Sequence, residues 1–173
     1  MQLFILDRNP AAAVRMLADV HVRKMCLETA QILSSVIVNY GGFITDGMPK
    51  TYNRNHPVIK ALDSPFKINY TVSYNLALHE EFFFRFEKKH KYYALTDIYR
   101  EILFDNENNI EDFSFCRNFK DCEITNPDII GAYREYYCFK KSIIRNWHYT
   151  KRKEPDFLFF CNILRINIEK KSF

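Results

Sequence analysis

The chain has 173 residues, of which 47% are hydrophobic and 27% are charged, and its formal net charge is +4. This length predicts one domain that buries enough apolar surface to fold without cross-links. The five cysteines are odd in number and form no C-x-x-C pair, so we expect reduced thiols rather than a disulfide framework or a zinc ribbon. The first residues have neither a basic start nor a long apolar segment, which predicts a cytoplasmic protein with no signal peptide and no membrane span.

The N-terminal third of the chain is expected to be largely helical. Residues 2–5 alternate between polar or aromatic and aliphatic side chains, which predicts a short strand or an extended arm. A helical segment follows from Pro10 to about Val38, with Asp19 as a candidate cap of a second helix inside it. Capping residues followed by proline mark this helix start and two later ones, at Asn9-Pro10, Ser64-Pro65 and Asn126-Pro127.

Between residues 19 and 40 the chain is apolar around most of a helix, apart from one narrow polar stripe. The stripe consists of His21, Lys24, Glu28, Gln31 and Ser35, which fall within roughly 80° of one another at 3.6 residues per turn. An otherwise apolar helix should be buried, and buried charges must pair with one another or line a cavity. The stripe therefore predicts a buried polar pocket. A polar network that merely fixes helix packing is the alternative.

Residues 39–57 contain three of the four glycines and two prolines, which predicts an ordered loop rather than regular structure. Long loops inside compact domains are often functional. His56 at the end of this loop, together with Tyr52 and Asn55, is therefore expected to close over the polar stripe. The alternative is an ordinary surface turn.

The next helix is predicted from Pro65 to about Glu87, because aromatic and apolar residues recur there at four-residue intervals as a core seam. A basic run follows, in which Lys89, His90 and Lys91 are candidate ligand-binding residues. Their purely structural role would be to complement the helix dipole. A shorter helix is expected from Thr96 to Phe104, ahead of an acidic loop without a recognisable metal-binding spacing.

The last long helix is predicted from Pro127 to about Tyr149, and the tail after it as helix or strand. Residues 134–153 hold seven lysines and arginines interleaved with aromatic residues. Cations suit phosphate contacts and aromatic rings stack on bases, so Tyr133 and Tyr137 are candidate ligand-binding residues. A solvated helix face is the alternative. Together these elements predict a compact, mainly helical single domain over residues 1–173.

Four segments of the chain, HVRKMCLETAQIL (21–33), NHP (55–57), FEKKHK (86–91) and AYREYY (132–137), resemble an uncharacterised family of short phage and bacterial proteins. The chain departs from that family's pattern at residues 156–157, where a tryptophan is usual. The family has no assigned activity, so the resemblance implies a viral or mobile-element origin, and hence the host cytoplasm, rather than a reaction. Phage proteins of this size commonly act on nucleic acid or blunt host defence.

Two functions fit the stripe. In the first, the protein is a glycosylase- or nuclease-like hydrolase of nucleic acid, with Lys24 as nucleophile or phosphate contact, Glu28 as general base and His21 or His56 as general acid. A Lys24–Glu28 ion pair would keep the lysine charged and oppose the nucleophile role. A divalent metal is one option for a cofactor, but the spacing of these residues is not diagnostic, and we assign no metal ligands from the sequence.

In the second function, the protein binds a nucleotide without converting it, and so sequesters a signalling molecule to counter host defence. The polar residues of the stripe, the loop and the basic run would hold the phosphate, with Gln31 and Asn55 as further hydrogen-bonding groups. Tyrosine rings would hold the base. Such a pocket needs donors and aromatic faces but no activated nucleophile.

Overall fold

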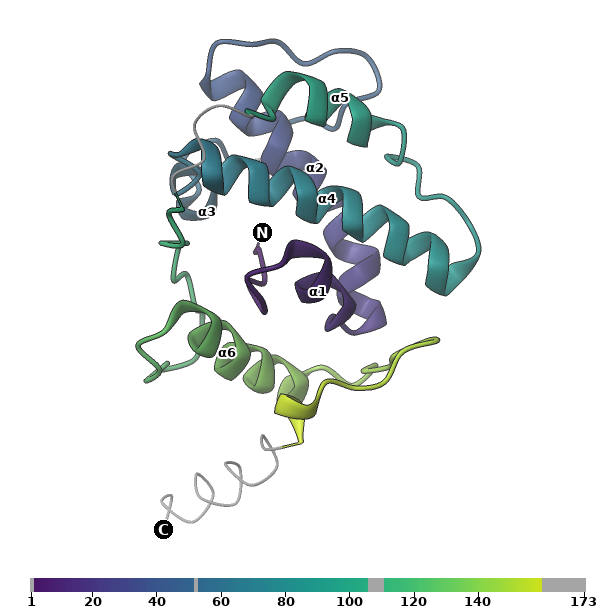
Figure 1. The fold of residues 1–173 in the computed structure, drawn as a ribbon, viewed down its shortest axis with the longest axis vertical. Coiled ribbons are helices and arrows are strands. Elements are labelled where there is room, and N and C mark those ends of the chain that lie inside the picture. Colours follow the sequence, from purple (N-terminus) through teal and green to yellow (C-terminus); the bar gives the residue numbers. More distant parts are fainter. Residues whose placement is uncertain (1, 52, 106–110, 160–173) are drawn as a thin grey trace.

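The structure is a computed structural model, and it describes residues 2–51, 53–105 and 111–159. In these residues the regular structure is entirely helical, and the predicted mainly helical single domain is confirmed (Figure 1). The elements in chain order are α1 (Pro10–Arg15), α2 (Asp19–Asn39), α3 (Pro57–Lys60), α4 (Pro65–Phe86), α5 (Leu95–Leu103), α6 (Ile129–Ile143) and the 3₁₀ turn η1 (Asp156–Leu158).

Two of the three predicted cap-proline helix starts are confirmed. The side chain of Asn9 accepts a hydrogen bond from the Ala12 amide at the start of α1, and Ser64 caps α4 in the same way. The third prediction is wrong, because α6 begins two residues later with Asp128 as its cap. The Asn126 side chain instead accepts a hydrogen bond from the Asp128 amide and forms a turn ahead of the helix.

The prediction that Asp19 caps α2 is also wrong. The capping position belongs to Ala18, whose side chain makes no cap hydrogen bond. The Asp19 carboxylate instead accepts hydrogen bonds from Arg85 and Thr150. A tertiary ion pair has therefore replaced the local capping interaction.

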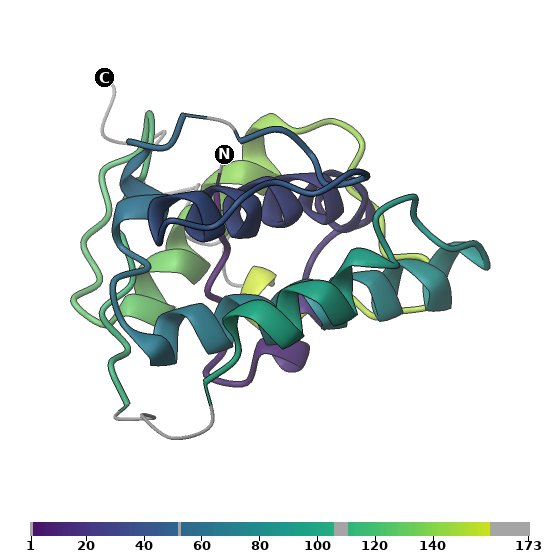
Figure 2. The ribbon, with the colours of Figure 1, turned by 90° about the horizontal axis from the view of Figure 1, so that it is seen from above.

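Helix α4 is the centre of the fold and packs against α1, α2 and α5 (Figure 2). Its predicted core seam is confirmed, since all of its members are buried except Phe66, which is partly buried. The remaining members of the seam are Tyr70, Tyr74, Leu78 and Phe82. Helix α2, which α4 contacts, is buried along most of its length.

The N-terminal residues form an extended arm that runs through the core, rather than a strand. Residues 3–6 are at most 3% exposed. Side chains satisfy the backbone of the arm: the Tyr70 hydroxyl donates to the Asp7 carbonyl at 2.7 Å and Arg134 Nε donates to the Leu6 carbonyl at 3.0 Å. The Phe4 ring contacts the Tyr137 ring of α6 at 5.0 Å between centroids. The arm thus joins α6 to the rest of the domain.

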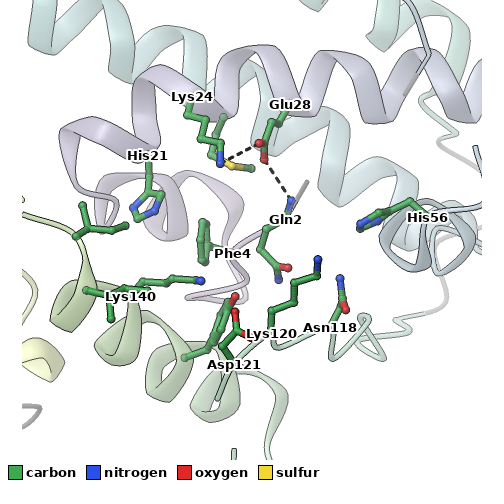
Figure 3. Close-up of a pocket in the computed structure, with 14 residues that line it drawn as sticks. Gln2, Phe4, His21, Lys24, Glu28, His56, Asn118, Lys120, Asp121 and Lys140 are labelled. Carbon is green, nitrogen blue, oxygen red and sulfur yellow. Dashed lines mark hydrogen bonds and ion pairs between the residues drawn. The ribbon is translucent and has the colours of Figure 1, made fainter. Parts of the chain in front are cut away.

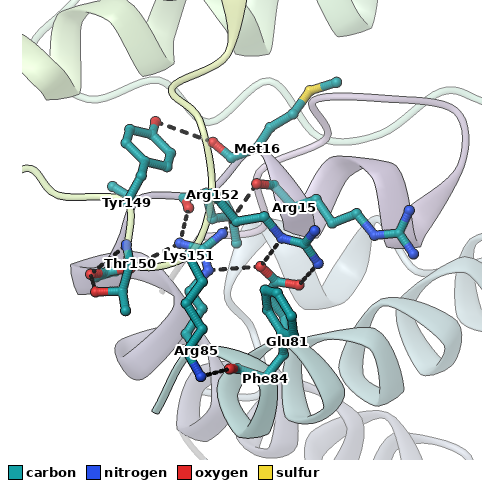
Figure 4. Close-up of polar contacts among 12 residues, drawn as sticks. Arg15, Met16, Glu81, Phe84, Arg85, Tyr149, Thr150, Lys151 and Arg152 are labelled. Atoms are coloured by element: carbon teal, nitrogen blue, oxygen red, sulfur yellow. Dashed lines mark hydrogen bonds and ion pairs between the residues drawn. The ribbon is translucent and has the colours of Figure 1, made fainter.

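The helix predicted to reach Tyr149 ends at Ile143, because Ile144 adopts an extended conformation. The chain then returns to α1 and α2, where the His148 carbonyl accepts a hydrogen bond from the Asp19 amide at 2.8 Å. A buried ion-pair network anchors this returning segment (Figure 4). In the network, Arg85 binds Asp19 and Glu81, and Glu81 also binds Arg152.

Three of the five cysteines, Cys26, Cys116 and Cys122, are free thiols as expected. Cys138 is disulfide-bonded, so the expectation of five reduced thiols is wrong at that position. None of the helices in the described part of the chain combines the length and apolar character that a membrane crossing requires. The predicted helix or strand of the tail lies mostly outside the described residues.

Candidate functional site

A cavity of about 340 Å³ lies between α2, the N-terminal arm, the start of α3, the 118–121 loop and the C-terminal half of α6 (Figure 3). It collects all four residues that the sequence analysis placed at the centre of a pocket: His21, Lys24, Glu28 and His56. Its other lining residues are Gln2, Phe4, Met25, Asn118, Lys120, Asp121, Tyr136, Lys140, Ile143 and Ile144.

His21 forms the buried end of the cavity. It is 5% exposed and packs against the rings of Phe4 and Trp147, and its Nδ1 lies 2.9 Å from the Tyr137 hydroxyl. Burial, with a smaller contribution from the charge of Lys24, lowers the pKa of His21 to about 3. The imidazole is therefore neutral at pH 7. It can donate one hydrogen bond and accept another, but it does not carry the second proton that a general acid would give up.

Lys24 and Glu28 pair across one helical turn, with 3.2 Å between the ammonium and the carboxylate. The Lys24 side chain is 64% exposed, whereas that of Glu28 is 13% exposed. The Glu28 carboxylate also accepts a hydrogen bond from the backbone N–H of Gln2. The expectation that the whole stripe is buried is therefore wrong for Lys24, which lies at the rim. A solvated, paired lysine lacks the desolvation that would make it a nucleophile at neutral pH.

His56 caps α3, and its Nδ1 accepts a hydrogen bond from the Val58 amide at 3.2 Å. Burial, together with the nearby charge of Lys120, lowers the pKa of this histidine below its ordinary value. A neutral ring that accepts at Nδ1 carries its proton on Nε2. His56 is therefore a neutral hydrogen-bond donor at the edge of the cavity.

Two lysines complete the cationic part of the cavity wall. One of them, Lys140, belongs to the basic segment 134–153 that was expected to contact phosphate, whereas the sequence did not point to the other, Lys120. Lys120 comes from the loop before α6 and Lys140 from α6 itself (Figure 3). Lys140 lies over the Tyr136 ring at 4.8 Å. Among the described residues, neither lysine is within ion-pair distance of a carboxylate, although Asp121 also lines the cavity. These two cations are available to a bound anion.

The remaining predicted ligand-binding residues do not line the cavity. Gln31 lies on α2 beyond the cavity residue Glu28, and its backbone carbonyl accepts a hydrogen bond from the Ser35 hydroxyl. Asn55 is exposed one residue before His56, and Tyr52 falls outside the described residues. The predicted pocket is thus smaller than the stripe and loop together suggested.

The basic run after α4 lies elsewhere. Lys89 and Lys91 each place their ammonium over a neighbouring tyrosine ring, and His90 packs against His79 at 5.3 Å between ring centroids. Tyr133 and Tyr137 are buried at 1% and 0% exposure, so their faces are not accessible for stacking on a base. Their packing is that of core residues.

The cations of residues 134–153 mostly form ion pairs within the fold. Their partners are the carboxylates of Asp7 for Arg134, Glu154 for Lys141, Glu87 for Lys151 and Glu81 for Arg152. These ion pairs leave fewer cations of this segment for phosphate contacts than the sequence suggested. Lys140 is the cation of α6 that reaches the cavity.

Comparisons of the chain with protein-family models, curated proteins and solved structures find no match.

Proposed function

We propose that the cavity binds a phosphate-bearing nucleotide. The observation that carries this proposal is the pair of cations, Lys120 and Lys140, which line one cavity without carboxylate partners among the described residues. A phosphate group would supply the missing negative charge, through charge-assisted hydrogen bonds. The neutral imidazoles of His21 and His56 add hydrogen-bonding groups to the same wall.

The apolar part of the cavity suits a nucleobase. Ile143 and Ile144 follow one another at the end of α6 and line the cavity, as does the ring of Phe4. A volume of about 340 Å³ is at the lower end of the range for small-ligand pockets. It fits a single nucleotide better than a stretch of double helix. An apolar wall with a few convergent polar groups is the usual composition of such sites.

Binding is favoured over hydrolysis because the general-acid role of the histidines and the nucleophile role of Lys24 do not fit the site. Both histidines are neutral near pH 7, for the reasons given above. Lys24 is solvated and paired with Glu28. The resemblance to short phage proteins extends the proposal to a biological role, in which the protein sequesters a host signalling nucleotide. A nuclease-like or glycosylase-like activity is retained as an outcome that the experiments below would reveal.

Isothermal titration of ATP, AMP and inorganic phosphate into the protein tests the proposal. Lys120→Ala and Lys140→Ala each remove one cation, and Lys153→Ala is the matched control because it removes an exposed cation outside the cavity. A hydrogen bond to a charged group contributes about 1.5–3 kcal/mol, so each cavity variant should weaken nucleotide binding at least about tenfold. Equal affinities in all four proteins would contradict the proposal.

A turnover assay separates the binder from the hydrolase. The same nucleotides and a single-stranded oligonucleotide are incubated with the protein, with and without Mg²⁺, and analysed by chromatography. The proposal predicts that they remain intact. Conversion that disappears in Glu28→Gln would instead assign a hydrolase to this cavity.

A further inference from the structure

A thiol and two imidazoles converge behind the cavity, on the opposite side of α2. Cys26 comes from α2, His79 from α4, and His90 from the turn after α4. One potential ligand atom from each residue lies within 4.8 Å of the other two. None of the three residues lines the cavity described above, so this cluster is independent of the proposed nucleotide site.

His79 is the feature of this cluster that packing alone does not explain. It is fully buried at 0% exposure, and neither of its ring nitrogens has a hydrogen-bond partner within the described part of the chain. Leaving a buried polar group unpaired carries an appreciable free-energy cost, and most such groups in folded proteins do find partners. An unpaired imidazole in contact with a second imidazole and near a thiol is typical of a metal ligand.

The donor set matches zinc. Zn²⁺ binds cysteine sulfur at about 2.3 Å and histidine nitrogen at about 2.0–2.1 Å, commonly with tetrahedral geometry. Two ligand atoms on one such ion are therefore roughly 3.3–3.6 Å apart. The three atoms, now within 4.8 Å of one another, would need to approach by at most about 1.2–1.5 Å. Rotation of the His90 side chain, which follows α4 and is only partly buried, can supply the part of this movement that involves His90.

The surroundings also suit a metal centre. The ring of Phe82 packs edge-on against His90 at 5.2 Å, and Tyr93 packs against His79 at 6.0 Å. Such an apolar shell limits the access of bulk water and lowers the local dielectric constant. The partial exposure of His90 gives an ion a route into the cluster.

We propose that Cys26, His79 and His90 bind one Zn²⁺ ion, with a fourth coordination position left for water or another ligand. On binding, the Cys26 thiol loses its proton to solvent and its sulfur bonds the ion, while both imidazoles bind as neutral donors without a change in their charge. The thiol now donates to the carbonyls of Val22 at 3.3 Å and Leu78 at 3.8 Å, and these contacts would be given up. No redox step is involved.

The test uses the full chain, stripped of metal with a chelator and then dialysed. Zinc content after addition of excess Zn²⁺ and removal of unbound ion is measured by mass spectrometry, and affinity by competition with a chromophoric chelator. Co²⁺ replaces Zn²⁺ as a spectroscopic probe, because a cobalt–thiolate bond adds a charge-transfer band in the near ultraviolet. The variants are Cys26→Ser and His90→Gln. Their matched controls are Cys122→Ser and His148→Gln, which alter a free thiol and an exposed imidazole outside the cluster.

We expect one Zn²⁺ per chain in the wild type and in both controls, together with a higher melting temperature than in the metal-free protein. Loss of an outer-shell partner alone costs about 10–100-fold in metal affinity, so loss of a ligand should cost more than about 100-fold. His90→Gln is informative even where Cys26→Ser does not fold, because His90 is only partly buried. A wild type that retains no zinc, cluster variants that retain it fully, or a cobalt form without the thiolate band would each overturn the proposal.

Discussion

Replacing Arg85 by methionine should destabilise the protein more than any other single change in its ion-pair network. The Arg85 side chain is fully buried and donates to Glu81 at 2.7 Å and to Asp19 at 2.9 Å. It also donates to the backbone carbonyls of Leu17 and Arg15. The variant would leave Asp19 without a guanidinium, take one of two guanidinium partners from Glu81 and leave two carbonyls without this donor, while the methionine fills part of the space.

Removing one partner of a buried ion pair costs about 3–5 kcal/mol. Here Asp19 retains Thr150 as a donor and Glu81 retains Arg152, so the lower end, about 3 kcal/mol, is expected. Arg152→Met should cost less, because its side chain is 31% exposed. The control is Lys151→Met, which removes an ion pair exposed to solvent and should therefore change the free energy of unfolding least.

Urea unfolding at pH 7, followed by circular dichroism, gives the free energy of unfolding of each variant by linear extrapolation. The predicted order of destabilisation is Arg85→Met, then Arg152→Met, then Lys151→Met. A loss in Arg85→Met no larger than that in Lys151→Met would refute the reasoning. It would mean that the buried network contributes little beyond what apolar packing supplies.

The same network should make stability depend on acid. Burial would raise the pKa values of Asp19 and Glu81, but hydrogen bonds from Thr150 and Arg85 to the first, and from Arg152 and Arg85 to the second, offset this and lower both. The two carboxylates therefore contribute their full stabilisation above their unfolded pKa values of 3.8 and 4.5, and this stabilisation is lost as the pH falls through their lower folded pKa values. Urea midpoints that fall equally in wild type and Arg85→Met between pH 7 and pH 3 would contradict this. Ile5→Ala should cost about 2–5 kcal/mol in urea unfolding, because Ile5 is fully buried in the arm, and a loss below about 1 kcal/mol would show that the arm is not part of the core. The ring signals of His21 should not titrate between pH 5 and pH 8 in NMR spectra, since its pKa is lowered to about 3, and a midpoint near 6.5 would place this ring in solvent.

The sequence predicts helices well where local interactions determine their ends. The side chains of Asn9 and Ser64 accept hydrogen bonds from backbone amides in the first turns of α1 and α4, as local capping predicts. Asp19 is the opposite case, because Arg85 is 66 residues away in sequence and no local pattern reveals it. Helix α6 is shorter than predicted for a related reason. Ile144 is extended and the chain returns to α1, and the periodicity of apolar residues does not show that return.

The candidate site follows the same division. The stripe on α2 could be predicted because it depends on a periodic pattern, and His56 was expected near it because it ends a long loop rich in glycine and proline. That His56 caps the short helix α3 was not predicted. Lys140 belongs to the basic segment 134–153, but neither its place in this cavity nor that of Lys120 could be predicted, since both depend on how the loop and α6 fold against α2. His79 shares a polar helix face with Asn75 in the sequence, but its approach to Cys26 depends on the packing of α4 on α2.

Mass spectrometry of the small molecules released from the natively purified protein on denaturation tests the central claim most directly. Wild type is compared with the double variant of Lys120→Ala and Lys140→Ala and with the Lys153→Ala control, all prepared in parallel from the same cells. We predict that wild type and control release the same phosphate-bearing nucleotide and that the double variant does not. Release of that nucleotide by all three proteins in equal amounts would contradict the assignment of the cavity.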